Sequence, residues 1–464
     1  MTMTHDLSRI PAQAALALFG GPPVIRTPWP PLATMGEEEV AAASEAIRSS
    51  IASGRATASG APGAPFTGGP RLRAFEALAA EHFGVRHAIA VNSWSSGLIA
   101  AVGAIGIEPG DEVITTPWTA SPTAAAILHW NGIPLFADID RETFNLDPAS
   151  VERQIGPRTK AVIAADIFGQ SADMASLREL CRVNGLALIS DSAQAPGART
   201  FDRMAGTLAD IGNYCLGDPH SAHGGHAGIL VTNDDRHARR LALIRHHAEA
   251  VVQGEQPAAL ANMLGYDFRL GEIEAAMASV QLGKLASRVA ARQRAAAQLG
   301  AGLAGLPGLH TPRLAVGNTH AYCVYGLRVD TPALALPRAR LLEALRAEGV
   351  PALSGGYQNL HRLPMFRHQI AHGSHGFPWS SAHCSQSIHY GPGLCPVAEQ
   401  LHTQTFIGLA LGQLAHGPEQ IGLIVAAFRK VWGQLDLLRP APTQAAASMP
   451  APAALPGPAL SGRA

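Results

Sequence analysis

Residues 160–195, KAVIAADIFGQSADMASLRELCRVNGLALISDSAQA, decide the fold class of this chain. The two ends of the stretch, KAVIAADIFG and LALISDSAQA, carry short uninterrupted apolar runs, which are typical of strands buried on both faces of a sheet. Between them, MASLRELCRVNG has the apolar spacing of an amphipathic helix. A strand, a covering helix and a second strand in this order predict two parallel strands of one sheet.

The same alternation runs through most of the chain from about residue 75. Its members include HAIAVNS (87–93), SGLIAAVGAIG (96–106), DEVITTP (111–117), PLFADID (134–140) and AGILVTND (227–234). Helices on both faces of a largely parallel sheet follow from this pattern, so we expect a three-layer α/β domain. Ligands bind at the carboxyl ends of the strands in such sheets, so polar residues just after each strand are the first candidates for a site.

The pattern also predicts how the chain divides. We expect an N-terminal arm over residues 1–30, a large α/β domain over 31–290, a smaller C-terminal α+β domain over 291–437 and a disordered Pro/Ala-rich tail over 438–464. Helical segments between about 270 and 305 bridge the two domains. Residues 52–67 are small and predicted to be flexible.

Composition narrows the classes of partner. The chain has 464 residues, 47% of them hydrophobic, and its 35 Lys and Arg balance 35 Asp and Glu, so its formal net charge is zero. Nothing in this balance indicates binding to nucleic acid, and no apolar run reaches the roughly 18 residues that a membrane span requires. Five scattered cysteines without a C-x-x-C pair fit a reducing compartment. We therefore expect a cytoplasmic protein that acts on a small molecule.

Several motifs occur in the order found in one enzyme family. They include LFGGPPVIRTPWP (18–30), GPRLRAFEALAAEHFGVRHAIAVNS (69–93), FADIDRETFNLDP (136–148), LGYDFRLGEIEAAMASVQL (264–282), NLHRLPMFR (359–367) and CPVAEQ (395–400). Over roughly residues 18–436 the chain resembles the DegT-type sugar aminotransferases, a fold-type-I pyridoxal-phosphate family, and most of all the branch that aminates keto-cyclitols such as scyllo-inosose. The resemblance implies a fold-type-I aminotransferase fold, a homodimer and a role in secondary metabolism such as antibiotic biosynthesis.

Two residues in DSAQAPGA (191–198) match the cofactor site of that family. The resemblance implies that Asp191 forms a salt bridge with the pyridine nitrogen, which keeps the cofactor ring an electron sink. Gln194 matches the glutamine that hydrogen-bonds near the ring oxygen of the cofactor. Taken alone, an aspartate after a buried strand is as well explained as a cap of the next helix.

The lysine that family members use is replaced. Aligned without gaps, GNYCLGDPHSAHGGHAGILVTND (212–234) puts His220 at the position of the Schiff-base lysine, and residues 171–283 contain no lysine at all. An imidazole cannot form the internal aldimine, but its pKa near 6.5 suits a general base at neutral pH. The resemblance offers one precedent, a branch of sugar 3-dehydratases that hold the amine form of the cofactor non-covalently and use histidine to remove a proton.

Further departures surround the expected cofactor. Cys215 replaces a phosphate-binding serine, Ala120 replaces an aromatic residue that stacks on the ring, and Asp267 replaces an asparagine that reaches the phosphate across the dimer. Trp94 replaces a glycine in the phosphate-binding turn, beside Ser95, which we also assign to the cofactor site.

Two more residues differ from the family pattern: His226 stands in place of Glu, and Asp166 in place of His. Together these changes predict that pyridoxal or pyridoxamine phosphate binds weakly, or not at all, although Trp94 could also replace the missing stacking ring.

Three histidines at intervals of three residues, His220, His223 and His226, invite a metal hypothesis. Their context is a glycine-rich loop, and no carboxylate accompanies them at a familiar spacing, so we assign no metal site. We interpret them as the lining of a polar pocket, with His220 nearest the substrate.

Three functions fit these observations. The first is a repurposed enzyme in which Asp191 and His220 act as acid and base on a keto-sugar, cyclitol-like or other polar metabolite. The second is a dehydratase or deoxygenase that uses pyridoxamine phosphate with His220 as base. The third is a catalytically silent homologue that partners an active aminotransferase. The changes around the phosphate favour the first and the third, and the matching Asp191 and Gln194 favour the first.

Overall fold

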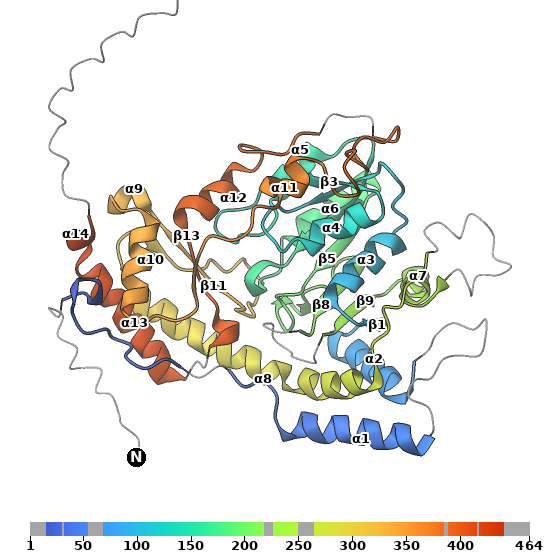
Figure 1. The fold of residues 1–464 in the computed structure, drawn as a ribbon, viewed down its shortest axis with the longest axis horizontal. Coiled ribbons are helices and arrows are strands. Elements are labelled where there is room, and N and C mark those ends of the chain that lie inside the picture. The colour runs from blue at the N-terminus through green and yellow to red at the C-terminus, as the bar shows by residue number, and fades with distance from the viewer. Residues whose placement is uncertain are drawn as a thin grey trace, which may run out of the picture.

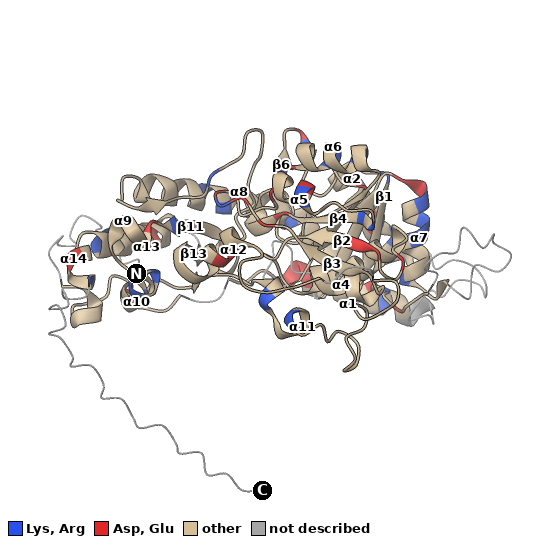
Figure 2. Cartoon of the chain, turned by 90° about the horizontal axis from the view of Figure 1, so that it is seen from above, with Lys and Arg blue, Asp and Glu red and all other residues tan. Residues whose placement is uncertain are grey.

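The computed structural model describes residues 15–29, 32–53, 68–217, 226–248, 264–384, 388–414 and 417–439. Predictions that concern 54–67, His220, His223 and the tail beyond 439 lie outside these residues. Both signs of charge are interspersed along the described chain (Figure 2). None of the described helices combines the length and the apolar character that a membrane crossing requires.

A seven-stranded sheet forms the centre of the larger part (Figure 1). Its strands lie in the order β1 (His87–Val91), β9 (Gly228–Thr232), β8 (Ile211–Cys215), β5 (Ala187–Asp191), β4 (Thr159–Ala165), β2 (Glu112–Thr115) and β3 (Ile133–Phe136). Neighbours from β8 to β3 are parallel, whereas β9 is antiparallel to both β1 and β8. The predicted three-layer, mostly parallel domain is thus confirmed.

Alternate residues of the strands point to opposite helical layers, as the two-residue period of a strand requires. Ile163 and Ile189 pack on one face with helices α3 (Trp94–Ala104), α4 (Pro122–His129) and α7 (Asp235–Arg245). Val162 and Leu188 pack on the other face with α6 (Met174–Asn184), near α5 (Pro148–Gln154). The same face is covered further along by α2 (Pro70–Phe83) and the first half of α8 (Glu272–Leu303).

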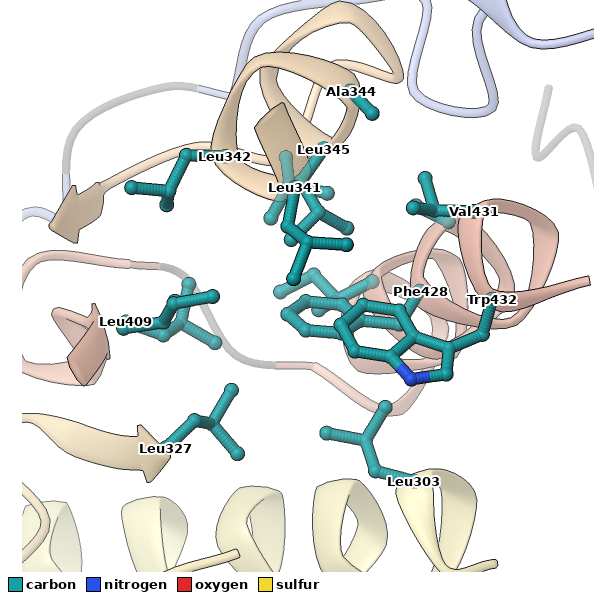
Figure 3. Packing of buried hydrophobic residues seen from close by; sticks show 14 of the residues in the cluster. Leu303, Leu327, Leu341, Leu342, Ala344, Leu345, Leu409, Phe428, Val431 and Trp432 are labelled. Atoms are coloured by element: carbon teal, nitrogen blue, oxygen red, sulfur yellow. The ribbon is translucent and has the colours of Figure 1, made fainter. Parts of the chain in front are cut away.

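A smaller antiparallel sheet lies at the other end of α8 (Figure 1). Its order is β10 (Leu309–His310), β11 (Tyr325–Val329), β13 (Phe406–Leu409) and β12 (Leu353–Gly355). Helices α9 (Thr331–Leu334), α10 (Arg338–Ala347), α13 (Pro418–Trp432) and α14 (Leu435–Leu438) accompany it. Figure 3 shows Leu327, Leu341, Phe428 and Trp432 packing together with Leu303 of α8, which ties this sheet to the long helix.

The remaining elements connect the two parts. Helix α1 (Glu37–Ser53) lies along α8, and a short hairpin pairs β6 (Arg199–Thr200) with β7 (Arg203–Met204). Helices α11 (Pro364–Arg367) and α12 (Pro396–Gln400) belong to a segment that packs on Trp118 and Phe136 at the large sheet. Residues far along the chain thereby reach the carboxyl edge of the parallel strands.

Candidate functional site

Asp191 is the last residue of β5 and lies at the carboxyl edge of the sheet, as predicted. Its side chain is 3% exposed and accepts hydrogen bonds at both oxygens. The Trp94 indole Nε1–H donates to Oδ1 over 2.8 Å, and the Thr123 hydroxyl donates to Oδ2 over 2.8 Å. The backbone N–H of Ala193 is a third, longer donor to Oδ1 at 3.3 Å. Both carboxylate oxygens of Asp191 therefore accept hydrogen bonds from other groups of the protein.

The buried position governs how Asp191 titrates. Burial penalises the charged carboxylate and raises its pKa to about 6, although the hydrogen bonds from Thr123 and Trp94 act in the opposite direction. The negative charge of the neighbouring Asp166 also raises this pKa. A carboxyl group in this state exchanges its proton between about pH 5 and pH 7, which satisfies one requirement for acid–base work.

The N-terminus of α3 holds Trp94 in place. Ser93 is the N-cap, and its hydroxyl accepts a hydrogen bond from the backbone N–H of Ser96 at 3.0 Å. Asn213 of β8 donates from Nδ2 to the Trp94 carbonyl oxygen at 3.0 Å. A Cβ at Gly228 would approach the Trp94 nitrogen to 2.8 Å, so β9 passes directly against this turn. The half-buried Ser95 follows in the same turn, and its assignment to the cofactor site stays a prediction.

Gln194 uses its amide on protein groups. Its Oε1 accepts from the Phe168 backbone N–H at 2.8 Å, and its Nε2 donates to the Tyr357 hydroxyl at 3.1 Å. Burial raises the pKa of Tyr357 to about 12, so this hydroxyl stays protonated at neutral pH. The ring of Tyr357 lies 5.6 Å from that of Trp118. The sequence analysis missed Thr123 and Tyr357, because only the folded chain brings them beside Asp191 and Gln194.

Two of the residues predicted near the phosphate differ in their surroundings. Cys215 ends β8, is buried, and has a thiol whose pKa burial raises to about 11, so it is protonated at neutral pH. Asp267 forms a two-point salt bridge with Arg269, with both N–O distances at 2.7 Å. The hydrogen bond from Arg269 lowers the pKa of Asp267, which is therefore a paired anion. Its proposed reach across a dimer stays a prediction.

The other departures from the family pattern are also placed. Asp166 follows β4, is 1% exposed, and accepts from Ser190 and Ser192 hydroxyls at 3.0 and 2.5 Å and from the Ala172 N–H at 2.8 Å. Ala120 is partly buried before α4, and His226 is exposed before β9. Among the described residues, no three His, Cys, Asp or Glu side chains are grouped as metal ligands would be.

The chain contains three lysines, and all three are described. Lys160 is exposed at the amino end of β4, the edge opposite Asp191. Lys284 of α8 pairs with Glu39 of α1 at 2.8 Å. Lys430 of α13 is buried against Glu348 at 2.9 Å. None of these amino groups stands at the carboxyl edge of the sheet.

Taken together, the mostly parallel seven-stranded sheet, the long bridging helix and the small antiparallel sheet define a fold-type-I aminotransferase. The sequence pattern of the DegT/DnrJ/EryC1/StrS aminotransferase family matches residues 55–401, so the chain belongs to that family. The resemblance found in the sequence is confirmed at the level of the family.

Similar proteins and a similar crystal structure support the assignment to this family. The spore coat polysaccharide biosynthesis protein SpsC of Bacillus subtilis (strain 168) is 31% identical over 316 residues, which are 67% of this chain and 81% of SpsC. The dTDP-3-amino-3,4,6-trideoxy-alpha-D-glucose transaminase of Micromonospora megalomicea subsp. nigra is 35% identical over 56% of this chain and 69% of its own. The crystal structure of S. venezuelae DesV with a ketimine intermediate matches with a TM-score of 0.69 at 28% identity, covering 86% of this chain and 96% of DesV.

The family uses pyridoxal or pyridoxamine phosphate, so the described residues can be tested against that cofactor. A carboxylate that holds the pyridine ring must offer an oxygen to the ring nitrogen. Here the indole ring of Trp94 lies against Asp191 and donates to Oδ1, so it competes with a pyridine ring for the space beside this carboxylate. The chain also has no lysine at this edge of the sheet. In this arrangement the described residues do not fit a pyridine ring held by Asp191.

Proposed function

We propose that this protein is a repurposed aminotransferase-fold enzyme. It acts by acid–base chemistry through His220 on a small keto-sugar, cyclitol-like or other polar metabolite, in secondary metabolism, with the family cofactor weakly bound or absent. The observation that carries the proposal is the placement of the three lysines, because lysine-relayed transamination needs a primary amine at the carboxyl edge. Membership of a family whose relatives include a sugar transaminase supports the substrate class.

The proposed chemistry is a proton transfer next to a carbonyl group. His220 takes a proton from a carbon beside the carbonyl, and the developing negative charge on the carbonyl oxygen is met by a proton donor of the pocket. Asp191 is the acid in this hypothesis, since burial raises its pKa to about 6. Its Oδ1 accepts from Trp94 and Ala193, whereas its Oδ2 accepts only from Thr123, so Oδ2 is the oxygen with capacity to carry and donate a proton. The pair would act between two subunits of a homodimer.

Proton exchange with solvent tests this function without knowledge of the final product. A keto-cyclitol or nucleotide-linked keto-sugar is incubated with purified protein in D2O, without any amino donor, and deuterium at the carbon beside the carbonyl is followed by NMR. We expect exchange that is lost in His220→Ala. His310→Ala is the control, since this exposed histidine lies in β10 of the smaller sheet, and it should keep the exchange.

The same assay separates the other two functions. Exchange that appears only after addition of pyridoxamine phosphate would favour the dehydratase-type enzyme and contradict independence of the cofactor. Exchange in none of the preparations, combined with stable association with an active family member, would favour the silent partner. Light scattering after gel filtration checks the proposed homodimer.

A further inference from the structure

We propose that the indole of Trp94 occupies the space beside Asp191 in which the cofactor ring would lie, here called the seat. Trp94 is then the residue that prevents the cofactor ring from binding there. In this structure Trp94 is the internal partner of Asp191, and removing its ring opens a non-covalent site for a pyridine phosphate. The inference deepens the proposed function, on which it rests, because it names the residue responsible for the weak or missing cofactor.

The hydrogen bond to Asp191 is the first reason. An indole N–H, like a protonated pyridine nitrogen, lies in the plane of its ring and points outward. A ring that donates to Asp191 Oδ1 at 2.8 Å must therefore extend away from the carboxylate into the volume that a pyridine ring would fill. Two rings cannot share that volume, and a ring that approached Oδ2 instead would have to share this oxygen with the Thr123 hydroxyl at 2.8 Å.

The backbone of Trp94 supplies the second reason. It is fixed by the Ser93 cap, by Asn213 on its carbonyl oxygen and by the close passage of Gly228 against its nitrogen. The residue can thus leave the seat only by rotating its side chain. Rotation would break its hydrogen bond to a buried carboxylate, and such bonds to charged groups are among the stronger ones.

The third reason is the burial of Asp191 itself. With its side chain 3% exposed, it would have no hydrogen-bond donor at Oδ1 except the longer Ala193 N–H if the indole were removed. A buried acceptor that loses its donor favours any ligand that restores the bond. A pyridine with a protonated ring nitrogen restores it, so the seat is a latent binding site.

Binding of pyridoxamine 5′-phosphate by equilibrium dialysis tests the proposal, since this probe carries its own amine and needs no lysine. Four proteins are compared: wild type, Trp94→Gly, Trp94→Phe and the double variant Trp94→Gly/Asp191→Asn. We expect W94G to bind at least about tenfold more tightly than wild type, the equivalent of one hydrogen bond to a charged group. W94F keeps a ring but loses the N–H that holds it against Asp191, so it should bind more tightly than wild type and less tightly than W94G. D191N should abolish the gain of W94G.

Several results would overturn the proposal. They are wild-type binding as tight as that of W94G, W94F binding as tightly as W94G, and no gain in W94G whose circular dichroism and melting show it to be folded. The outcome is independent of the exchange assay. Gain of binding in W94G together with no His220-dependent exchange would keep this proposal and remove the proposed function, and the reverse pattern would do the opposite.

Discussion

Asp166 directly follows β4, and Asp191 ends the adjacent parallel strand β5. Both are almost fully buried, yet their hydrogen-bond donors come from different parts of the fold. The donors to Asp166 are close by: the backbone of Ala172 and the hydroxyls of Ser190 and Ser192, the residues before and after Asp191. The side-chain donors to Asp191 come from the first turns of two helices of another layer. Asp166 thus takes its hydrogen bonds from residues at the same edge of the sheet. Asp191 takes its side-chain hydrogen bonds from Trp94 and Thr123, which are distant in the sequence and can be substituted one at a time.

The largest effect is expected at Asp166. Asp166→Ala removes the shared acceptor of the Ser190 and Ser192 hydroxyls and of the Ala172 N–H, and only one of the two hydroxyls can then donate to the other. We therefore expect a loss of about 3 kcal/mol or more in the free energy of unfolding. Urea denaturation at pH 7 measures it. A loss below about 1 kcal/mol would show that water replaces the carboxylate and that Asp166 is no more structural than Asp191.

The pH dependence of stability sharpens the comparison at Asp191. Its pKa of about 6 in the folded state exceeds the ordinary value of 3.8, so its favourable contribution is full below about pH 4 and is lost as pH rises through 6. Asp191→Asn stays neutral. Between pH 4 and pH 7.5, wild type should therefore lose about 2–3 kcal/mol relative to D191N.

Urea titrations of both proteins across that range provide the measurement. Asp166 is present in both proteins, but its charge interacts with that of Asp191, so the difference reports the titration of the coupled pair. A constant difference from pH 4 to pH 7.5 would mean that Asp191 titrates as an ordinary carboxyl group.

A smaller effect is expected from Trp94→Phe, which keeps a ring but removes the donor to Asp191. We expect a loss of about 1.5–2 kcal/mol at pH 7 and a further rise of the Asp191 pKa, since the hydrogen bond from Trp94 lowers it. Thr123→Val is the matched variant at the other oxygen and should move stability and pKa in the same direction. Unchanged stability in W94F would imply that the indole contributes nothing at Asp191.

The smallest effect is expected at Cys215, which lies on the strand beside Asp191. Burial raises the pKa of its thiol to about 11, and the charge of Asp191 adds to the rise. Iodoacetamide at pH 8 should therefore modify Cys215 far more slowly in the folded protein than in urea, as peptide mass spectrometry would show. Cys215→Ser should change stability by less than about 1 kcal/mol. Rapid modification of the folded protein would contradict the buried, protonated thiol.

The apolar runs were enough to predict the strands of the larger sheet. The predicted strands in KAVIAADIFG and LALISDSAQA are β4 and β5, and the predicted helix in MASLRELCRVNG is α6. They were predictable because two short buried strands joined by an amphipathic helix pack as parallel neighbours in one sheet. In the smaller domain, the apolar stretch THAYCVYGLRV (319–329) forms a strand only over Tyr325–Val329, which pairs with β13 and β10. The helix predicted over 270–305 runs from Glu272 to Leu303.

The contacts within the site were less predictable. Asp191 could be placed at the carboxyl edge from its strand, but Trp94 is 97 residues away and its direction is set by the Ser93 cap and the packing of Gly228. Tyr357 comes from the second half of the chain and meets Gln194 only because that segment folds back over the large sheet. Side-chain direction depends on three-dimensional packing, which periodicity does not encode.

Because the chain has only three lysines, a fluorescent dye can be attached at a known place and used to follow Trp94. Lys284 and Lys430 are held in ion pairs, so an amine-reactive dye should label Lys160 more readily than either of them. A fluorophore there sits at the edge of the sheet opposite to Trp94. The part of the energy transfer that W94F removes would then report when that indole swings away from β5.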